Sequence, residues 1–227
     1  MDAWDPRQAR RNRLLNGLSA EALAELTPDF QPRELAARAH VVPLGEPIEC
    51  VYFPLSCVCS TVAHVDRGEG VEVATIGNEG VSGLPVFLGI DVPAALEMRA
   101  KRGRDRQLAV LLGHYTQALI TQISQGSACN RIHSAEQRCA RWLLMTHDRV
   151  SRDEFELTHE FLAQMLGVRR ATVTEIAGAL QDAGAIRYAR GVMSVVHRGI
   201  LRARCCECYD FIQSEYARLL PPPAGET

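Results

Sequence analysis

The sequence predicts an α+β protein: an all-β N-terminal unit, then a long helix, then a C-terminal helix-turn-helix with a β-hairpin wing. Three observations support this prediction. Short apolar runs broken by glycine and proline fill residues 35–88, and apolar residues recur at helical spacing from Leu108. Residues 157–196 then read as helix, turn, helix and hairpin, before a last helix.

The composition is that of a globular chain without a large excess of charge. Of the 227 residues, 47% are hydrophobic and 23% are charged, and the net charge is −2. Any contact with nucleic acid therefore needs a local basic patch. No apolar run has the length of a signal-peptide core or a membrane span, so we expect a cytoplasmic protein with no membrane partner and reduced cysteines.

The clearest strand of the β unit lies at residues 71–75. Val71, Val73 and Thr75 would point to one face, and Glu72 and Ala74 to the other. The sequence DRGEG just before this strand favours a hairpin turn.

The long helix carries an apolar stripe formed by Leu108, Leu112, Tyr115, Leu119 and Ile123. This stripe either packs on the β unit or forms the seam between two subunits, and the C-terminal segment favours the seam. We expect Gly126 and the small residues after it to interrupt the helix. A second helix would follow over AEQRCARWLLMTHDRV.

Residues 157–196 carry the most specific pattern. Thr158 can cap a first helix through its hydroxyl, and Gly167 supplies a turn that would strain other residues. A close helix crossing is predicted by the joint spacing of Leu162, Ala163, Leu166, Gly167, Val168, Val173 and Ile176. This is the pattern of a helix-turn-helix.

The second helix begins at a pair of arginines, Arg169 and Arg170. A helix N-terminus is partly positive, so each arginine there costs about 0.3–1 kcal/mol unless an anion offsets it. Arg190 sits at the wing tip, and residues 157–198 hold five arginines against three acidic residues. The simplest anion is the DNA backbone, so that a phosphate or a guanine edge would meet the arginines. The alternative is plain three-helix packing with solvated arginines.

With these residues in view, the chain resembles the CRP/FNR family of transcriptional regulators from about residue 30 to 220. The resemblance rests on LTHEFLAQMLGVRRATVTEIAGALQDAGAI, on VYFP at 51–54 and on IGNEGVSGLPVFLG at 76–89. It implies an N-terminal double-stranded β-helix, a jelly-roll-like β-roll that senses an effector, over 1–105. It further implies a dimerisation helix over 106–135 and a winged-helix DNA-binding domain over 136–227.

The resemblance also implies roles for individual residues. Thr158 and Thr172 would hold phosphates, and Arg170 would read a base. Their neighbours in the groove would be Arg169, Ala171, Thr174 and Glu175. Many family members carry a glutamate and an arginine where this chain has Ala171 and Glu175, so we expect a different operator.

The sensor half departs further from the family. Candidate effector-binding residues are Gly77, Gly83 and Leu84, but Leu84 and Pro85 stand where cyclic-nucleotide binders of the family place a glutamate after the glycine. VPAALEM replaces the arginine pair that binds the cyclic phosphate, which argues against cyclic AMP. The join at 99–107 is also shorter than in the family.

We predict no cofactor and no metal. Cys57 and Cys59 are too close in sequence, and Cys50 comes too late, for the family's iron–sulfur cluster, while haem stays open. If Cys205, Cys206 and Cys208 lay on one helix, they would point in different directions, so we interpret them as packed or idle thiols.

No catalytic motif is complete. His159-Glu160 begins like a zinc-protease motif, but Ala163 occupies the place of the second histidine. We therefore expect a non-enzymatic homodimer that binds palindromic double-stranded DNA, with RNA polymerase and an unknown small-molecule effector as further partners. The alternative is a ligand- or redox-sensing β-roll module with vestigial DNA binding.

Overall fold

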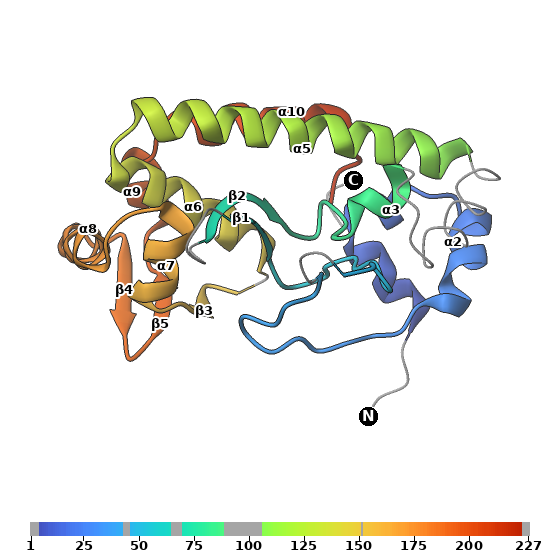
Figure 1. The fold of residues 1–227 in the computed structure, drawn as a ribbon, viewed down its shortest axis with the longest axis horizontal. Coiled ribbons are helices and arrows are strands. Elements are labelled where there is room, and N and C mark those ends of the chain that lie inside the picture. Colours follow the sequence, from blue (N-terminus) through green and yellow to red (C-terminus); the bar gives the residue numbers. More distant parts are fainter. Residues whose placement is uncertain (1–4, 43–45, 65–69, 89–105, 151, 224–227) are drawn as a thin grey trace. The chain divides into compact units, whose positions relative to one another are not determined.

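The computed structural model describes all residues except 1–4, 43–45, 65–69, 89–105, 151 and 224–227 (Figure 1). The chain divides into two compact units. One comprises 1–57, 76–118 and 216–227, and the other comprises 58–75 and 119–215. These units cut across the ranges 1–105, 106–135 and 136–227, which stay a prediction. The mixed α+β class is confirmed.

The first unit begins with short helices that the sequence analysis did not predict. They are η1 (Pro6–Arg11), α1 (Arg13–Asn16), α2 (Ala20–Leu26) and η2 (Thr27–Asp29). The side chain of the fully buried Asn12 connects these helices to the rest of the unit by hydrogen bonds. Its Oδ1 accepts from the N–H groups of Leu14 and Leu15, and its Nδ2 donates to the carbonyls of Pro54 (3.1 Å) and Gly80 (2.8 Å).

Regular strands occupy less of residues 35–88 than the sequence predicted. The described residues there form β1 (Cys59–His64) paired with β2 (Gly70–Ile76), an isolated bridge between Tyr52 and Ser82, and a short helix, α3 (Leu84–Leu88). Prolines interrupt the other apolar runs, and a proline has no N–H to donate to a ladder. The expected hairpin turn after β1 and most of the short join at 99–107 lie outside the described residues.

The long helix α5 (Arg106–Ile132) runs through Gly126 without a break, so the predicted interruption is wrong. A glycine weakens a helix by about 1 kcal/mol but does not end it. A Cβ at Gly126 would lie 4.0 Å from the carbonyl oxygen of Val73, so the backbone of β2 passes close by. The chain breaks after Ile132 instead, and Ser134 starts α6 (Ala135–Arg149) with a capping box.

The apolar stripe of α5 is buried within the chain, which contradicts its interpretation as a subunit seam. Leu108, Leu112, Tyr115 and Leu119 are all buried, and Ile123 is half-buried. The hydroxyl of Tyr115 donates to the carbonyl of Val81 at 3.3 Å. The burial supports the other interpretation, in which the stripe packs on the β unit of the same chain.

The second unit contains the predicted winged helix-turn-helix. Its helices are α7 (His159–Leu166) and α8 (Arg170–Asp182), and its strands are β3 (Glu154–Glu156), β4 (Ile186–Ala189) and β5 (Val192–Val195). The strands form an antiparallel sheet in the order β3-β5-β4 (Figure 1). The sequence analysis missed β3, because a three-residue strand with a single buried side chain leaves almost no periodicity.

Two helices, α9 (Arg198–Ala203) and α10 (Cys208–Leu219), replace the single last helix that the sequence predicted. Neither glycine nor proline stands in the break between them; tertiary packing marks it, since Cys206 and Cys208 are buried there against Cys129. Within the described part of the chain, no helix is both long and apolar enough to cross a membrane.

Candidate nucleic-acid interface

The helix-turn-helix packs as its sequence predicted. Leu162, Ala163 and Leu166 of α7, together with Val173 and Ile176 of α8, are buried. Val168, in the turn, is half-buried. Because these residues fix the inner faces of both helices, they also fix which residues of α8 point outward.

Gly167 makes the turn between the helices. Its φ of 63° is in the left-handed region, and its N–H caps the end of α7 at the carbonyls of Ala163 and Gln164. Arg138 of α6 donates to the carbonyl of Leu166 at 3.0 Å. The end of α7 is therefore held both by its own turn and by a neighbouring helix.

The two helices begin very differently. The hydroxyl of Thr158 accepts from the N–H of Phe161 at 3.2 Å, and Glu160 lies in the first turn of α7. At α8, by contrast, Arg169 occupies the N-cap, no side chain caps the helix, and no acidic residue lies in the first turn. The start of α8 therefore presents exposed N–H groups and positive charge together.

The outward face of α8 matches the prediction. Arg169, Arg170, Ala171, Thr174 and Glu175 are all exposed, and Thr172 is half-buried. Arg170 has an acidic neighbour, but its Nε lies 3.9 Å from Oε2 of Glu160 and both side chains are more than 70% exposed. Such a pair contributes little, so Arg170 stays available to a ligand.

The wing tip is a two-residue turn with an arginine in an unusual conformation. Ala189 pairs with Val192, and Arg190 and Gly191 between them have φ values of 51° and 81°. Two successive positive φ values define a type I′ turn, which favours asparagine and glycine. Arginine in the left-handed region costs about 1 kcal/mol, and such strain is common at functional positions.

The structure corrects the count of basic residues that can face DNA. Arg187 pairs with Glu154 at 3.3 Å. Arg198 is bound to Asp148 and to the hydroxyl of Tyr209. Of the five arginines between residues 157 and 198, Arg169, Arg170 and Arg190 are exposed and have no ion pair shorter than 3.9 Å among the described residues.

His159 was not predicted as part of this surface. Its Nδ1 lies 3.1 Å from Oγ1 of Thr174, whose hydroxyl donates to the carbonyl of Arg170. Its ring stacks on Tyr188 of β4 at 4.2 Å. Burial, with a smaller effect from Arg170, lowers the pKa of His159. The imidazole thus links α7, α8 and the wing, a role that no local motif could reveal.

The candidate effector residues lie in the first unit. Gly83 has a φ of 95°, and an added Cβ would approach Val51 to 3.0 Å, so its backbone requires glycine. The N–H of Gly77 donates to the buried Glu79 at 3.1 Å. Leu84 begins α3 and is half-buried. The structure thus gives Gly77 and Gly83 roles in holding this loop.

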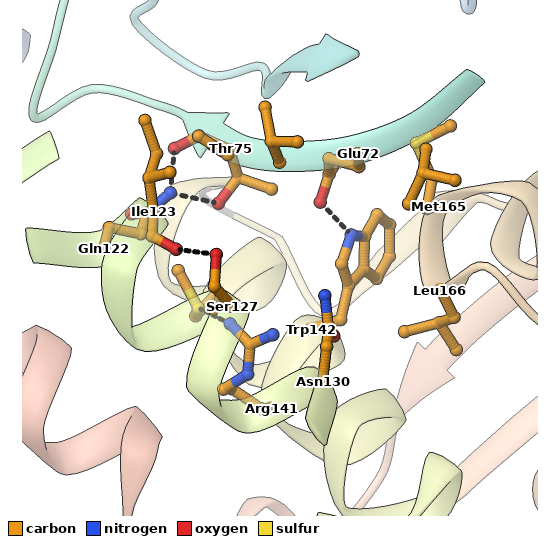
Figure 2. Close-up of a pocket in the computed structure, with 15 residues that line it drawn as sticks. Glu72, Thr75, Gln122, Ile123, Ser127, Asn130, Arg141, Trp142, Met165 and Leu166 are labelled. Atoms are coloured by element: carbon orange, nitrogen blue, oxygen red, sulfur yellow. Dashed lines mark hydrogen bonds between the residues drawn. The ribbon is translucent and has the colours of Figure 1, made fainter. Parts of the chain in front are cut away.

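A small hollow of about 90 Å³ lies in the second unit between β2, α5, α6 and α7 (Figure 2). Nε1 of Trp142 donates to Glu72 at 2.7 Å, and the hydroxyl of Ser60 also bonds that carboxylate. Burial raises the pKa of Glu72 to about 7. Ligand pockets usually measure about 300–1,000 Å³, so the hollow is too small for a nucleotide-sized effector.

Comparisons with known proteins support this geometry. A model of the Crp-like helix-turn-helix domain matches residues 137–204. No curated protein sequence gives a significant match.

Similar solved structures include a putative CRP/FNR-family transcriptional regulator from Eubacterium rectale, 15% identical over 85% of this chain and 97% of that one, with a TM-score of 0.56. They also include FixK2 from Bradyrhizobium japonicum, 18% identical over 71% of this chain and 89% of that one, with a TM-score of 0.58. The c-di-GMP-responsive global regulator CLP from Xanthomonas campestris is 14% identical over 78% of this chain and 99% of that one, with a TM-score of 0.60.

At these identities the solved structures establish the fold, and the domain match covers α6 to α9, including the exposed start of α8 and the wing. Residues 137–204 form a Crp-like helix-turn-helix domain, and the chain has the fold of solved CRP/FNR-type transcriptional regulators.

Proposed function

We propose that this protein is a transcriptional regulator that acts as a homodimer and binds a two-fold symmetric site in double-stranded DNA. In each subunit α8 would lie in the major groove, with Arg170 at a base edge and Arg169, Ala171, Thr174 and Glu175 beside it. Thr158, Thr172 and Arg190 would bind phosphates. Two such subunits would place their half-sites about 34–36 Å apart.

The observation that carries this proposal is the uncapped start of α8. Two arginines stand where a helix favours negative charge, and no capping side chain or acidic first-turn residue offsets them. A bound phosphate would meet the exposed N–H groups and both guanidinium groups at once. The strained Arg190 at the wing tip supplies a second phosphate contact on the same domain.

A second face of α5 supports dimerisation. Seven exposed residues follow the alternating three- and four-residue spacing of a coiled-coil seam: Val110, Gly113, Gln117, Ile120, Ser124, Ser127 and Arg131. Val110 and Ile120 are 47% and 53% exposed, although they are large and apolar. The small residues Gly113, Ser124 and Ser127 on the same face would let a second helix approach closely. This face therefore suits a second copy of α5.

Dimerisation has its own test. Ile120→Glu should convert a dimer to monomers in sedimentation equilibrium, because it would bury a charge at the centre of the seam. Phe211→Glu is the matched control, since Phe211 is 48% exposed on α10, outside this face. A chain that is monomeric at every concentration, or an Ile120→Glu variant that stays dimeric, would contradict the proposed seam.

The effector proposal is narrower. A small molecule other than cyclic AMP would act through the N-terminal half, near Gly77, Gly83 and Leu84. Leu84 and Pro85 offer no carboxylate that could bind the ribose hydroxyl groups of cyclic AMP, which argues against cyclic AMP as the effector. RNA polymerase would be a further partner of the DNA-bound dimer.

DNA binding is tested by selecting bound sequences from a randomised duplex library with the purified full chain. The wild type should enrich a palindrome, and Arg170→Ala should enrich it much less, with one position in each half-site relaxed. Arg202→Ala is the matched control, because it removes an arginine of α9 that is paired with Asp210. If neither the wild type nor the control enriches a sequence, the operator proposal fails for the free protein. The selection is then repeated with candidate effectors.

A further inference from the structure

Four potential metal ligands converge in the second unit, on elements other than α8 and the wing. Cys129 and His133 come from the C-terminal end of α5, and Cys206 and Cys208 come from the junction between α9 and α10. Their ligand atoms all lie within 4.8 Å of one another. The three thiols are buried, and the side chain of His133 is only 12% exposed.

Two separations between ligand atoms have the size expected around a single ion. The Sγ atoms of Cys129 and Cys206 are 3.6 Å apart, and Sγ of Cys208 lies 3.5 Å from Nδ1 of His133. Zinc binds cysteine sulfur at about 2.3 Å and histidine nitrogen at about 2.0–2.1 Å in a tetrahedron, whose S–S and S–N edges are then about 3.8 Å and 3.5 Å. Both measured separations match these edges closely.

The surroundings of His133 add an independent observation. Its Nδ1 faces the thiols, while its Nε2 lies 3.1 Å from Oε1 of Glu207. Histidines that bind metal usually donate their other ring N–H to a carboxylate or carbonyl, which fixes the tautomer and the ring orientation. Nε2–H donating to Glu207 would leave the Nδ1 lone pair free for a cation.

We infer that Cys129, His133, Cys206 and Cys208 form a four-coordinate site for one zinc-class divalent cation, which fastens the end of α5 to the α9–α10 junction. Each coordinated thiol would release its proton to solvent and bind as a thiolate. A Cys₃His set that closes all four positions is typical of a structural zinc site. This inference does not depend on DNA binding.

Two other chemistries fit less well. An iron–sulfur cluster places its own iron and sulfide atoms between the cysteines, so it needs wider spacing than these side chains show. A disulfide between Cys129 and Cys206 would have to close 3.6 Å to about 2.05 Å. It would also leave Cys208 and the oriented His133 without a role.

The first test is the metal content of the full chain, purified without chelator and measured by mass spectrometry. We expect one zinc per chain. After removal of the metal, added Co²⁺ should give the visible bands of tetrahedral cobalt and a near-ultraviolet thiolate band. Cys208→Ser should lose both signals, whereas Cys205→Ser should keep them, because Cys205 neighbours the cluster without belonging to it.

A variant that weakens zinc binding without removing a ligand provides a second test if the cysteine substitutions disturb folding. Glu207 is 80% exposed, so Glu207→Gln should fold, yet it should weaken zinc binding by roughly 10- to 100-fold. Absence of zinc together with no cobalt spectrum would overturn the inference. So would a Cys129–Cys206 disulfide, acid-labile sulfide bound with iron, or equal zinc affinity in wild type and Glu207→Gln.

Discussion

Two sites in the second unit place an ionisable group in an unfavourable environment. At one site other residues of the chain compensate for that environment, and at the other they do not. Glu72 is largely shielded from water, but Trp142 and Ser60 bond its carboxylate and its pKa rises to about 7. Arg169 and Arg170 stand at the positive end of α8, and no side chain caps that end.

The difference separates a structural charge from a ligand-binding one. At Glu72 the compensation comes from inside the chain: hydrogen bonds and a raised pKa offset the loss of water. At α8 the described residues offer only the loose contact of Arg170 with Glu160. An external anion would complete that site, and we propose that it is the DNA backbone.

The largest expected effect is on DNA recognition. Arg170→Ala should weaken binding to the selected operator by about 1–3 kcal/mol and relax base preference at one position in each half-site. The folded chain should lose no stability, because Arg170 contributes no strong internal contact. Fluorescence anisotropy with matched and mismatched duplexes measures the first effect, and thermal unfolding measures the second. Equal affinity for both duplexes in wild type would remove Arg170 as a reader of bases.

The next effect concerns Glu72 and pH. The pKa of Glu72 is about 7 in the folded chain and 4.5 for an ordinary glutamate, so between these values only the unfolded chain ionises. Its stabilising contribution is therefore present below pH 4.5 and is lost as pH rises through 7. The free energy of unfolding of wild type should therefore fall, relative to that of Glu72→Gln, by roughly 2 kcal/mol as the pH rises from 5 to 8.

Chemical denaturation at both pH values measures this difference. Glu156→Gln provides the matched control, because Glu156 is an exposed glutamate on β3 and the substitution should leave the pH dependence unchanged. A Glu72→Gln variant whose pH dependence equals that of wild type would show that the carboxylate is ionised in the folded chain throughout this range.

A third, smaller effect is expected at Arg169, where one substitution should raise stability and abolish DNA binding. Arg169→Asp supplies the missing N-cap, so the free energy of unfolding should rise by about 1 kcal/mol. The same change places a negative charge toward the phosphates and should abolish operator binding. Thr158→Ala, which removes the existing cap of α7, should lower stability by about 1 kcal/mol. Loss of stability in Arg169→Asp would refute the uncapped start of α8.

The smallest effect is at the wing. Arg190→Gly relieves a positive φ and should leave stability unchanged or raise it by up to about 1 kcal/mol. Binding should weaken equally for all sequences, and the slope of log affinity against log salt should fall by about one unit. An unchanged salt slope would mean that Arg190 meets no phosphate.

The winged helix was predictable because its signals are local. The caps, the turn glycine and the buried faces of α7 and α8 depend on residues close together in sequence, so periodicity and turn chemistry predicted them and the exposed face that follows. The short helices around Asn12 were missed, since that buried side chain bonds carbonyls far along the chain. Strand β3 was missed because it is defined by its partner β5.

By itself, the sequence determined the α+β class, the helix-turn-helix and its two leading arginines, because each rests on spacing within one segment. Tertiary structure decided which face of α5 is buried, and it let that helix continue through Gly126. It also divided the predicted last helix into α9 and α10, and it brought Cys206 and Cys208 close to Cys129 and His133. Those outcomes depend on contacts between residues distant in sequence, which no local pattern encodes.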